Sequence, residues 1–187
     1  MLLDLKIKAD YPNAKELKSH LAGGSLVKSL LSVSIRGRLA VGEGYKVAIF
    51  DVGQLVAQLI RQATIAAVTA DKANVKPLSK NVVRFEIVHL VFNPVVENYL
   101  SVAGYEDCQV LTVSHGGEVT DRLAIELSLQ GSYIRHVDWV PGSQVQLMVV
   151  TNRFVKIYDL SQDNISPMHY FTLPDDMIVD ATLVVAT

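Results

Sequence analysis

Residues 133–160, YIRHVDWVPGSQVQLMVVTNRFVKIYDL, decide the fold, because three short runs of alternating apolar and polar residues are separated there by two turn signals. The first run stops at Pro141-Gly142, a dipeptide that favours a turn and cannot continue a strand ladder. The second stops at residues 151–153, after which the alternation resumes at Phe154. Alternation with a period of two is typical of β-strands. The stretch therefore predicts a β-meander.

The same pattern occurs twice more upstream. Residues 88–94 align without a gap on residues 135–141, at a displacement of 47 residues. Residues 39–51 form a shorter copy of residues 148–159. The positions that carry the repeat, which we expect to be structural core positions, are Phe50, Asp51, Phe92, Pro94, Trp139, Pro141, Tyr158 and Asp159. A strand-bearing repeat of about 40–50 residues is the signature of a β-propeller blade.

We therefore predict an all-β fold, a partial WD40-like β-propeller of about three and a half blades. Each predicted blade is an antiparallel meander of four strands. The predicted domains are an N-terminal segment at residues 1–24, which contains a short helix at 14–21, and a partial propeller at 25–187. The predicted blades cover residues 25–70, 82–127 and 133–173, with the start of another at 177–187.

A partial propeller cannot close a ring, because propellers usually have about four to eight blades and an open stack leaves sheet faces uncovered. Expected partners are therefore the remaining blades and domains of a larger protein, another protein, or a second copy that completes a ring of about seven blades. Half of the residues are apolar, the net charge is only −2, and the mean hydropathy is +0.28. These values are expected if such partners cover part of the apolar surface of the chain.

Residues 54–70 fit two structures. Leu55, Leu59 and Ala63 follow helical spacing, whereas the β-branched residues of 64–69 favour a strand. We predict an outer strand at 64–69, followed by an exposed loop between blades at 71–81.

The composition also restricts the compartment and the partners. The single cysteine, Cys108, excludes an internal disulfide and a multi-cysteine zinc site, and we expect it to be a buried small hydrophobe in a reducing compartment. No apolar run approaches the roughly 18 residues that a membrane span needs. The N-terminal lysines lack the interleaved aromatic residues of a nucleic-acid footprint. We expect an intracellular, cytoplasmic protein without nucleic acid, membrane insertion or cofactor.

Two features imitate ligand sites. The glycines of residues 42–44 lie between two predicted strands and lack a following helix, so a tight hairpin is favoured over a phosphate loop. His89 and His136 recur at the repeat period, which is typical of a structural position, and no third metal ligand is evident.

Trp139 alternates with the inward residues of its strand, so we predict a core anchor.

Two further sets of residues imitate a catalytic centre. Ser114, His115 and Asp121 lie along one predicted hairpin without a nucleophile elbow, and chance adjacency explains them. The carboxylate pairs at 106–107 and 175–176 lie on turns, where neighbouring side chains point apart and stay solvated. We therefore assign no catalytic, cofactor-binding or metal-binding residue.

Three long segments resemble one family. They are residues 31–53, residues 91–111 and residues 137–167. The chain resembles the WD40-like propeller of the giant UBR-box ubiquitin ligases, called calossin or Pushover in animals and BIG in plants. Its sequence is more similar to the plant branch. It departs from regular WD40 repeats, because the second blade has Leu111-Thr112 where the others have an aromatic residue followed by Asp. The buried hydrogen-bond network of regular WD40 blades is therefore not expected.

The resemblance implies part of a very large intracellular ligase that recognises destabilising N-termini through a zinc box and is linked in plants to auxin transport and growth. One cysteine and five histidines cannot build that zinc box. The leading hypothesis is thus a non-catalytic protein-interaction scaffold within such a ligase. The alternative is a self-contained small β-domain that binds a small ligand or acts as an enzyme, for which a pocket with convergent polar groups is the expected sign.

Overall fold

The computed structural model describes residues 28–65, 75–129, 131–173 and 176–184. The predicted helix at 14–21 and the proposed domain boundary after residue 24 lie outside these residues. The rest of this section concerns the described residues alone.

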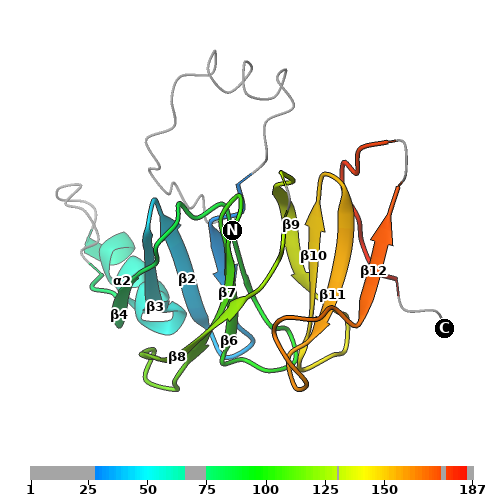
Figure 1. The fold of residues 1–187 in the computed structure, drawn as a ribbon. Helices are drawn as coiled ribbons and strands as arrows, with labels where there is room; N and C mark the ends of the chain where they lie inside the picture. Colours follow the sequence, from blue (N-terminus) through cyan, green and yellow to red (C-terminus); the bar gives the residue numbers. More distant parts are fainter. Residues whose placement is uncertain (1–27, 66–74, 130, 174–175, 185–187) are drawn as a thin grey trace, which may run out of the picture.

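The fold consists of three four-stranded antiparallel sheets, which lie one after another in chain order (Figure 1). The first sheet contains β1 (Leu31–Val33), β2 (Arg38–Glu43), β3 (Lys46–Asp51) and β4 (Ser79–Val82). The second contains β5 (His89–Phe92), β6 (Tyr99–Ala103), β7 (Cys108–Val113) and β8 (Val119–Ile125). The third contains β9 (Ile134–Trp139), β10 (Gln146–Thr151), β11 (Phe154–Asp159) and β12 (His169–Thr172). The predicted all-β class is confirmed.

Alternation along the strands of the third sheet explains its two faces. In the ladder, Trp139 pairs with Leu147, and Leu147 pairs with Tyr158. Paired residues share a face, and their chain neighbours point to the other face. The buried residues that pack toward the second sheet include Val137, Trp139, Leu147, Val149 and Tyr158. The buried residues on the opposite face are Met148, Val150 and Ile157.

The first strands of the three sheets follow one another at the inner edge of the stack. Ser29, just before β1, forms a parallel bridge with His89 of β5, and the N–H of Leu90 donates to the carbonyl of Ser29 over 2.8 Å. The N–H of Ile134, at the start of β9, donates to the carbonyl of Tyr105 over 2.7 Å. One core cluster fills the space between the first and second sheets, and another fills the space between the second and third. The sheets therefore stack face to face, as propeller blades do.

Of the predicted outer strand at 64–69, the structure describes residues 64 and 65. There the prediction is wrong, because Val52–Ile65 forms the helix α2. The carboxylate of Asp51 accepts the N–H of Gln54 over 3.0 Å. Asp51 therefore caps the N-terminus of α2, and the residue that it bonds lies three positions later in the chain. An Asp followed three residues later by Gln is close to the capping-box pattern. This pattern is the signal that could have located the helix.

The outer strand of the first sheet is instead β4, in a segment predicted to be a loop. The N–H of Leu78 donates to the carbonyl of Ile49 over 2.7 Å and begins the pairing with β3. The hydroxyl of Ser79 donates to the carbonyl of Gly117 over 2.6 Å. These contacts fix the register of a short polar strand that its own sequence specifies only weakly.

The predicted first strand of another blade, at 177–187, is not a strand over its described part. Residues 176–184, which we call the C-terminal segment, lie across the outer face of the third sheet. The N–H of Ile178 donates to the carbonyl of Asn152 over 3.0 Å. Ile178, Ala181 and Leu183 pack in the cluster that contains Met148 and Val150. The alternating apolar residues thus pack against a sheet face without joining a ladder.

Candidate functional site: the contacts between sheets

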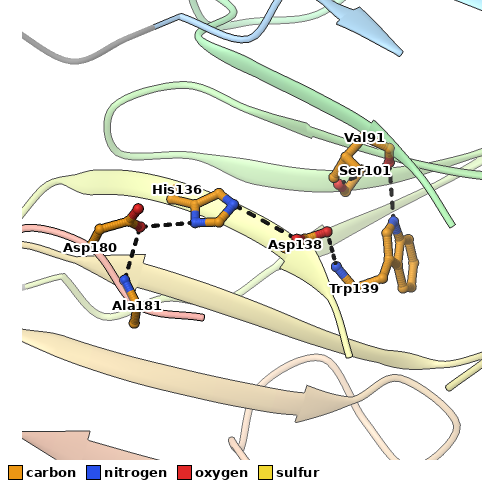
Figure 2. A network of polar contacts seen from close by, with 7 residues as sticks. All are labelled: Val91, Ser101, His136, Asp138, Trp139, Asp180 and Ala181. Carbon is orange, nitrogen blue, oxygen red and sulfur yellow. Dashed lines mark hydrogen bonds and ion pairs between the residues drawn. The ribbon is translucent and has the colours of Figure 1, made fainter. Parts of the chain in front are cut away.

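The residues that join the second and third sheets meet at Trp139. Its side chain is 3% exposed, and its indole N–H donates to the carbonyl of Val91 over 3.1 Å (Figure 2). The hydroxyl of Ser101 donates to the same carbonyl over 3.2 Å. The ring stacks on Tyr99, with 6.3 Å between ring centroids. Trp139 is therefore both an apolar anchor and a hydrogen-bond donor between two sheets.

Asn93 makes the second link between these sheets. Its side chain is fully buried, and its amide nitrogen donates to the carbonyls of Ser143 and Gln144 over 3.2 and 3.1 Å. Its amide oxygen accepts the N–H groups of Val95 and Val96 over 2.7 and 2.8 Å. An amide side chain has two donors and one acceptor oxygen with two lone pairs, so this inventory is completely used.

The two aromatic-Asp dipeptides occupy equivalent places at the ends of β3 and β11. Tyr158 is fully buried, and its hydroxyl donates to the carbonyl of Glu126 over 3.0 Å; burial raises its pKa above the ordinary value. Asp159 accepts the hydroxyl and the N–H of Ser161 over 2.6 and 3.0 Å. These bonds hold the pKa of Asp159 below its usual range. The dipeptides therefore end a strand and order the turn that follows.

Asp51 ends β3 and caps the helix α2, and its partner Arg38 reaches the second sheet. Its carboxylate pairs with the guanidinium of Arg38, which donates as well to the carbonyl of His115 in the turn after β7. The N–H of Gln54 and the Arg38 guanidinium hold the pKa of the Asp51 carboxyl below its usual range. Phe50 beside it is half-buried. Arg38 is thus a link between sheets that the sequence pattern did not indicate.

The remaining repeat positions divide into core and surface. Phe92 is buried, and its N–H donates to the hydroxyl of Ser32 over 2.9 Å. Pro94 and Pro141 are exposed, at the bend after β5 and the turn after β9. The two prolines therefore end strands and are not core residues.

The two histidines that recur at the repeat period lie near each other on the inner strands, with 6.0 Å between ring centroids. His89 is 7% exposed, burial lowers its pKa, and its Nε2 has no hydrogen-bond partner. His136 contacts Asp180 of the C-terminal segment over 3.2 Å and Asp138 over 3.9 Å (Figure 2). Among the described residues, no group of three or more His, Cys, Asp and Glu side chains could hold a metal ion.

The residues that imitate a catalytic centre serve the local fold. The hydroxyl of Ser114 accepts the N–H of Glu118 over 3.1 Å and orders the turn between β7 and β8. His115 contributes its backbone carbonyl to Arg38. Cys108 is buried, and burial raises the pKa of its thiol to about 12, so it is not a nucleophile near neutral pH. Gly44, at φ 56°, completes the predicted hairpin between β2 and β3.

Acid should weaken this fold through three carboxyl groups. The pKa values of Asp51, Asp159 and Asp163 lie below the ordinary 3.8 in the folded chain. A group whose folded pKa is depressed stabilises the fold above its unfolded pKa and loses that contribution as the pH falls through the folded value. We expect the melting temperature to fall first below about pH 6.5, where the buried His89 has to take up a proton, and to fall further below about pH 4 as these three carboxyl groups are protonated.

The Asp51→Asn variant isolates one part of this effect, since asparagine still caps the helix but carries no charge. Its melting temperature should fall less steeply below about pH 4 than that of the parent, as followed by circular dichroism. Identical slopes for the two chains would contradict the role of Asp51.

Comparison with solved structures defines the class of fold. The β-propeller domain of Myceliophteria thermophila Cps50 (Swd1) superposes with a TM-score of 0.55 at 13% identity, over 79% of this chain and 42% of that chain. The N-terminal domain of Nup159 superposes with a TM-score of 0.52 at 12% identity, over 79% of this chain and 34% of that chain. The three sheets are therefore β-propeller blades.

Sequence comparison identifies the group. The chain is 80% identical over 182 residues to the auxin transport protein BIG of Oryza sativa subsp. japonica. The matched residues cover 97% of this chain and 4% of that protein. It is 38% identical over 188 residues to a probable E3 ubiquitin-protein ligase of Dictyostelium discoideum, covering 97% and 3% of the two chains. It is 36% identical over 149 residues to the protein purity of essence of Drosophila pseudoobscura pseudoobscura, covering 79% and 3%.

The chain is thus a BIG-like propeller segment, similar to a short stretch of the giant BIG and calossin-like proteins. It spans about 3–4% of the length of the curated relatives it matches. No protein-family model matches the chain. Within the described residues, no helix is long and apolar enough to cross a membrane.

Proposed function

We propose that the chain is a section of a larger β-propeller that acts as a non-catalytic protein-interaction scaffold in a BIG-like protein. The observation that supports this proposal is the distribution of exposed large apolar side chains. Those on and beside the first sheet are Leu31, Val33, Ile35, Tyr45, Val56, Ile60 and Val82. Those after β11 are Ile165, Met168, Tyr170, Phe171, Leu173, Met177, Val179 and Val184. The second sheet and its loops expose only Val95 and Tyr105 among the described residues.

The second sheet is an internal comparison for the other two. It packs against a sheet on both faces and exposes little apolar surface, whereas in the described part of the chain each end sheet has a single neighbouring sheet, and only the C-terminal segment packs on the outer face of the third. Monomeric soluble proteins rarely expose large contiguous apolar patches. Leu31 and Val33 share the outer face of the first sheet with Leu39 and Val41, because these residues pair directly across the ladder. Further blades on both sides would cover the two ends.

The relatives suggest a wider role. One is a protein of auxin transport and another is a probable E3 ubiquitin-protein ligase. We extend these roles to this chain as a proposal: it supports a giant ubiquitin ligase that acts in the cytoplasm on destabilising N-termini, and in plants in auxin transport and growth. The scaffold itself would carry no reaction step. Its partners would be the remaining blades and domains of that protein.

The proposal is tested by the solution mass of the isolated chain, measured by light scattering after size exclusion, together with its circular dichroism and its binding of a fluorescent apolar dye. We expect a strong β signal, dye binding and self-association. Replacing Leu31 and Val33 with threonine should reduce both dye binding and association, because threonine is favoured in strands, as valine is, while its hydroxyl makes the exposed face less apolar. The matched control, Val95→Thr in the loop between β5 and β6 of the second sheet, should change neither.

Two results would contradict the proposal. A monodisperse monomer that binds no dye would favour the self-contained β-domain, which binds a ligand or catalyses a reaction. A stable dimer that dissociates in the Leu31 and Val33 double variant would favour two copies that complete one ring.

A further inference from the structure

The outer edge of the third sheet has an unusual strand. β12 is the last strand of the order β9-β10-β11-β12, and each of its four residues is exposed. It pairs with β11 on one side, and no strand in the described part of the chain pairs with its other side. An edge strand presents unpaired N–H and carbonyl groups and is a template for pairing with another chain.

The other two outer strands carry the charges that usually block such pairing. β4 contains Lys80, and β8 contains Asp121 and Arg122 in succession. β12 reads HYFT and contains no Lys, Arg, Asp, Glu or Pro. Natural sheets protect their edges with charged residues and proline. The edge of the third sheet is therefore the one of the three that lacks this protection.

Both faces of β12 offer aromatic surface to an added strand. Tyr170 is 56% exposed and pairs with Lys156, while Phe171 is 54% exposed and pairs with Val155 on the opposite face. The rings of His169 and Phe171 lie with centroids 6.2 Å apart. Cross-strand pairs with aromatic residues stabilise sheets, so a strand laid along this edge would find partners on each side.

A cavity of about 850 Å³ opens beside Tyr170, and its polar lining indicates the chemistry it accepts. The ammonium of Lys156 lies 4.6 Å from the ring centre of Phe154 and 5.8 Å from that of Tyr170, and it donates to the carbonyl of Leu127. Arg153 adds a second cation, and Asp176 is the acidic residue of the lining. The surplus of positive charge favours a carboxylate.

We propose that β12 is a docking edge, at which an extended segment of a partner polypeptide adds as a fifth strand of the third sheet and directs an acidic side chain to the cavity beside Tyr170. In strand addition of this kind, main-chain hydrogen bonds supply the affinity and side-chain pockets supply the specificity. This inference rests on the proposed scaffold role and names one of its surfaces and the chemistry of its partner.

The test uses a fluorescein-labelled peptide of seven residues, with alternating valine and threonine around a central glutamate, in fluorescence polarisation with the full chain. Phe171→Lys should weaken binding at least tenfold, because it places on β12 the kind of charge that β4 carries. Attraction between lysine and the glutamate of the peptide acts in the opposite direction, so a loss of binding reports on the edge. The matched control, Val82→Lys at the end of β4, should leave binding unchanged.

Two further variants separate the main-chain and side-chain contributions. Peptides that are N-methylated at alternate amides, in the two possible registers, should differ, since only one register directs its N–H groups to β12. Arg153→Glu should remove the preference for the glutamate peptide over one with a central lysine.

Equal affinity of the parent and the folded Phe171→Lys variant would overturn the proposal, and so would equal affinity of the two N-methylated peptides. Self-association that is lost in Phe171→Lys, without peptide binding, would overturn it in favour of a second copy at this edge. If the peptide fails to bind while the variants of Leu31 and Val33 behave as expected, the docking edge is refuted and the scaffold role is retained.

Discussion

Trp139→Ala is expected to lower the free energy of unfolding by about 3–5 kcal/mol. The ring is 3% exposed and packs on Tyr99 between the second and third sheets, so its removal leaves a cavity where the two sheets meet. For a chain of this size, such a loss corresponds to a fall in melting temperature of roughly 6–20 °C. Trp139 is the single tryptophan, so unfolding in urea is best followed by far-ultraviolet circular dichroism.

Trp139→Phe is the control that separates packing from hydrogen bonding. Phenylalanine keeps much of the apolar ring but cannot donate to the carbonyl of Val91, which still accepts the hydroxyl of Ser101. We expect a loss of about 1 kcal/mol, the usual net contribution of one hydrogen bond, plus a smaller packing loss. Unfolding midpoints for Trp139→Ala that match those of the parent would refute the anchoring role.

The fold could be predicted where alternation and turn signals agree. Residues 133–160 show both, and their predicted meander is the ladder of β9, β10 and β11. The prediction failed at α2 and β4, where local patterns are ambiguous. The helix has β-branched residues near its end, and its start depends on one side-chain bond from Asp51. β4 is short and polar, and its register depends on contacts with the distant residues Ile49 and Gly117.

The candidate site was predicted in part for a similar reason. A repeat comparison finds positions that recur, and it therefore selects Phe50-Asp51 and Tyr158-Asp159, which end equivalent strands. It assigns no role to Asn93 or Arg38, since each joins a residue on another sheet. Their partners are backbone carbonyls, which any sequence supplies. No pattern of residue types can therefore indicate these contacts before the sheets are placed.

Asn93→Ala is expected to cost about 2–4 kcal/mol of unfolding free energy, although the side chain is small. The substitution leaves the N–H groups of Val95 and Val96 and the carbonyls of Ser143 and Gln144 without their partner. A buried donor or acceptor left unpaired costs about 1–3 kcal/mol, and water that enters beside the exposed Pro94 offsets part of the sum. Urea denaturation followed by tryptophan fluorescence measures the change.

Asn93→Asp is the matched variant, because the carboxylate still accepts both N–H groups but cannot donate to Ser143 or Gln144. At neutral pH its charge faces two carbonyl oxygens in a buried position, so it should destabilise at least as much as Asn93→Ala. Below the pKa of the new carboxyl, a protonated oxygen can donate to one of the carbonyls, and the difference from the parent should shrink. The difference in unfolding free energy between Asn93→Asp and the parent could instead be the same at pH 7 and pH 4. The carbonyls of Ser143 and Gln144 would then not depend on this donor, and Asn93 would order its own turn without joining the sheets.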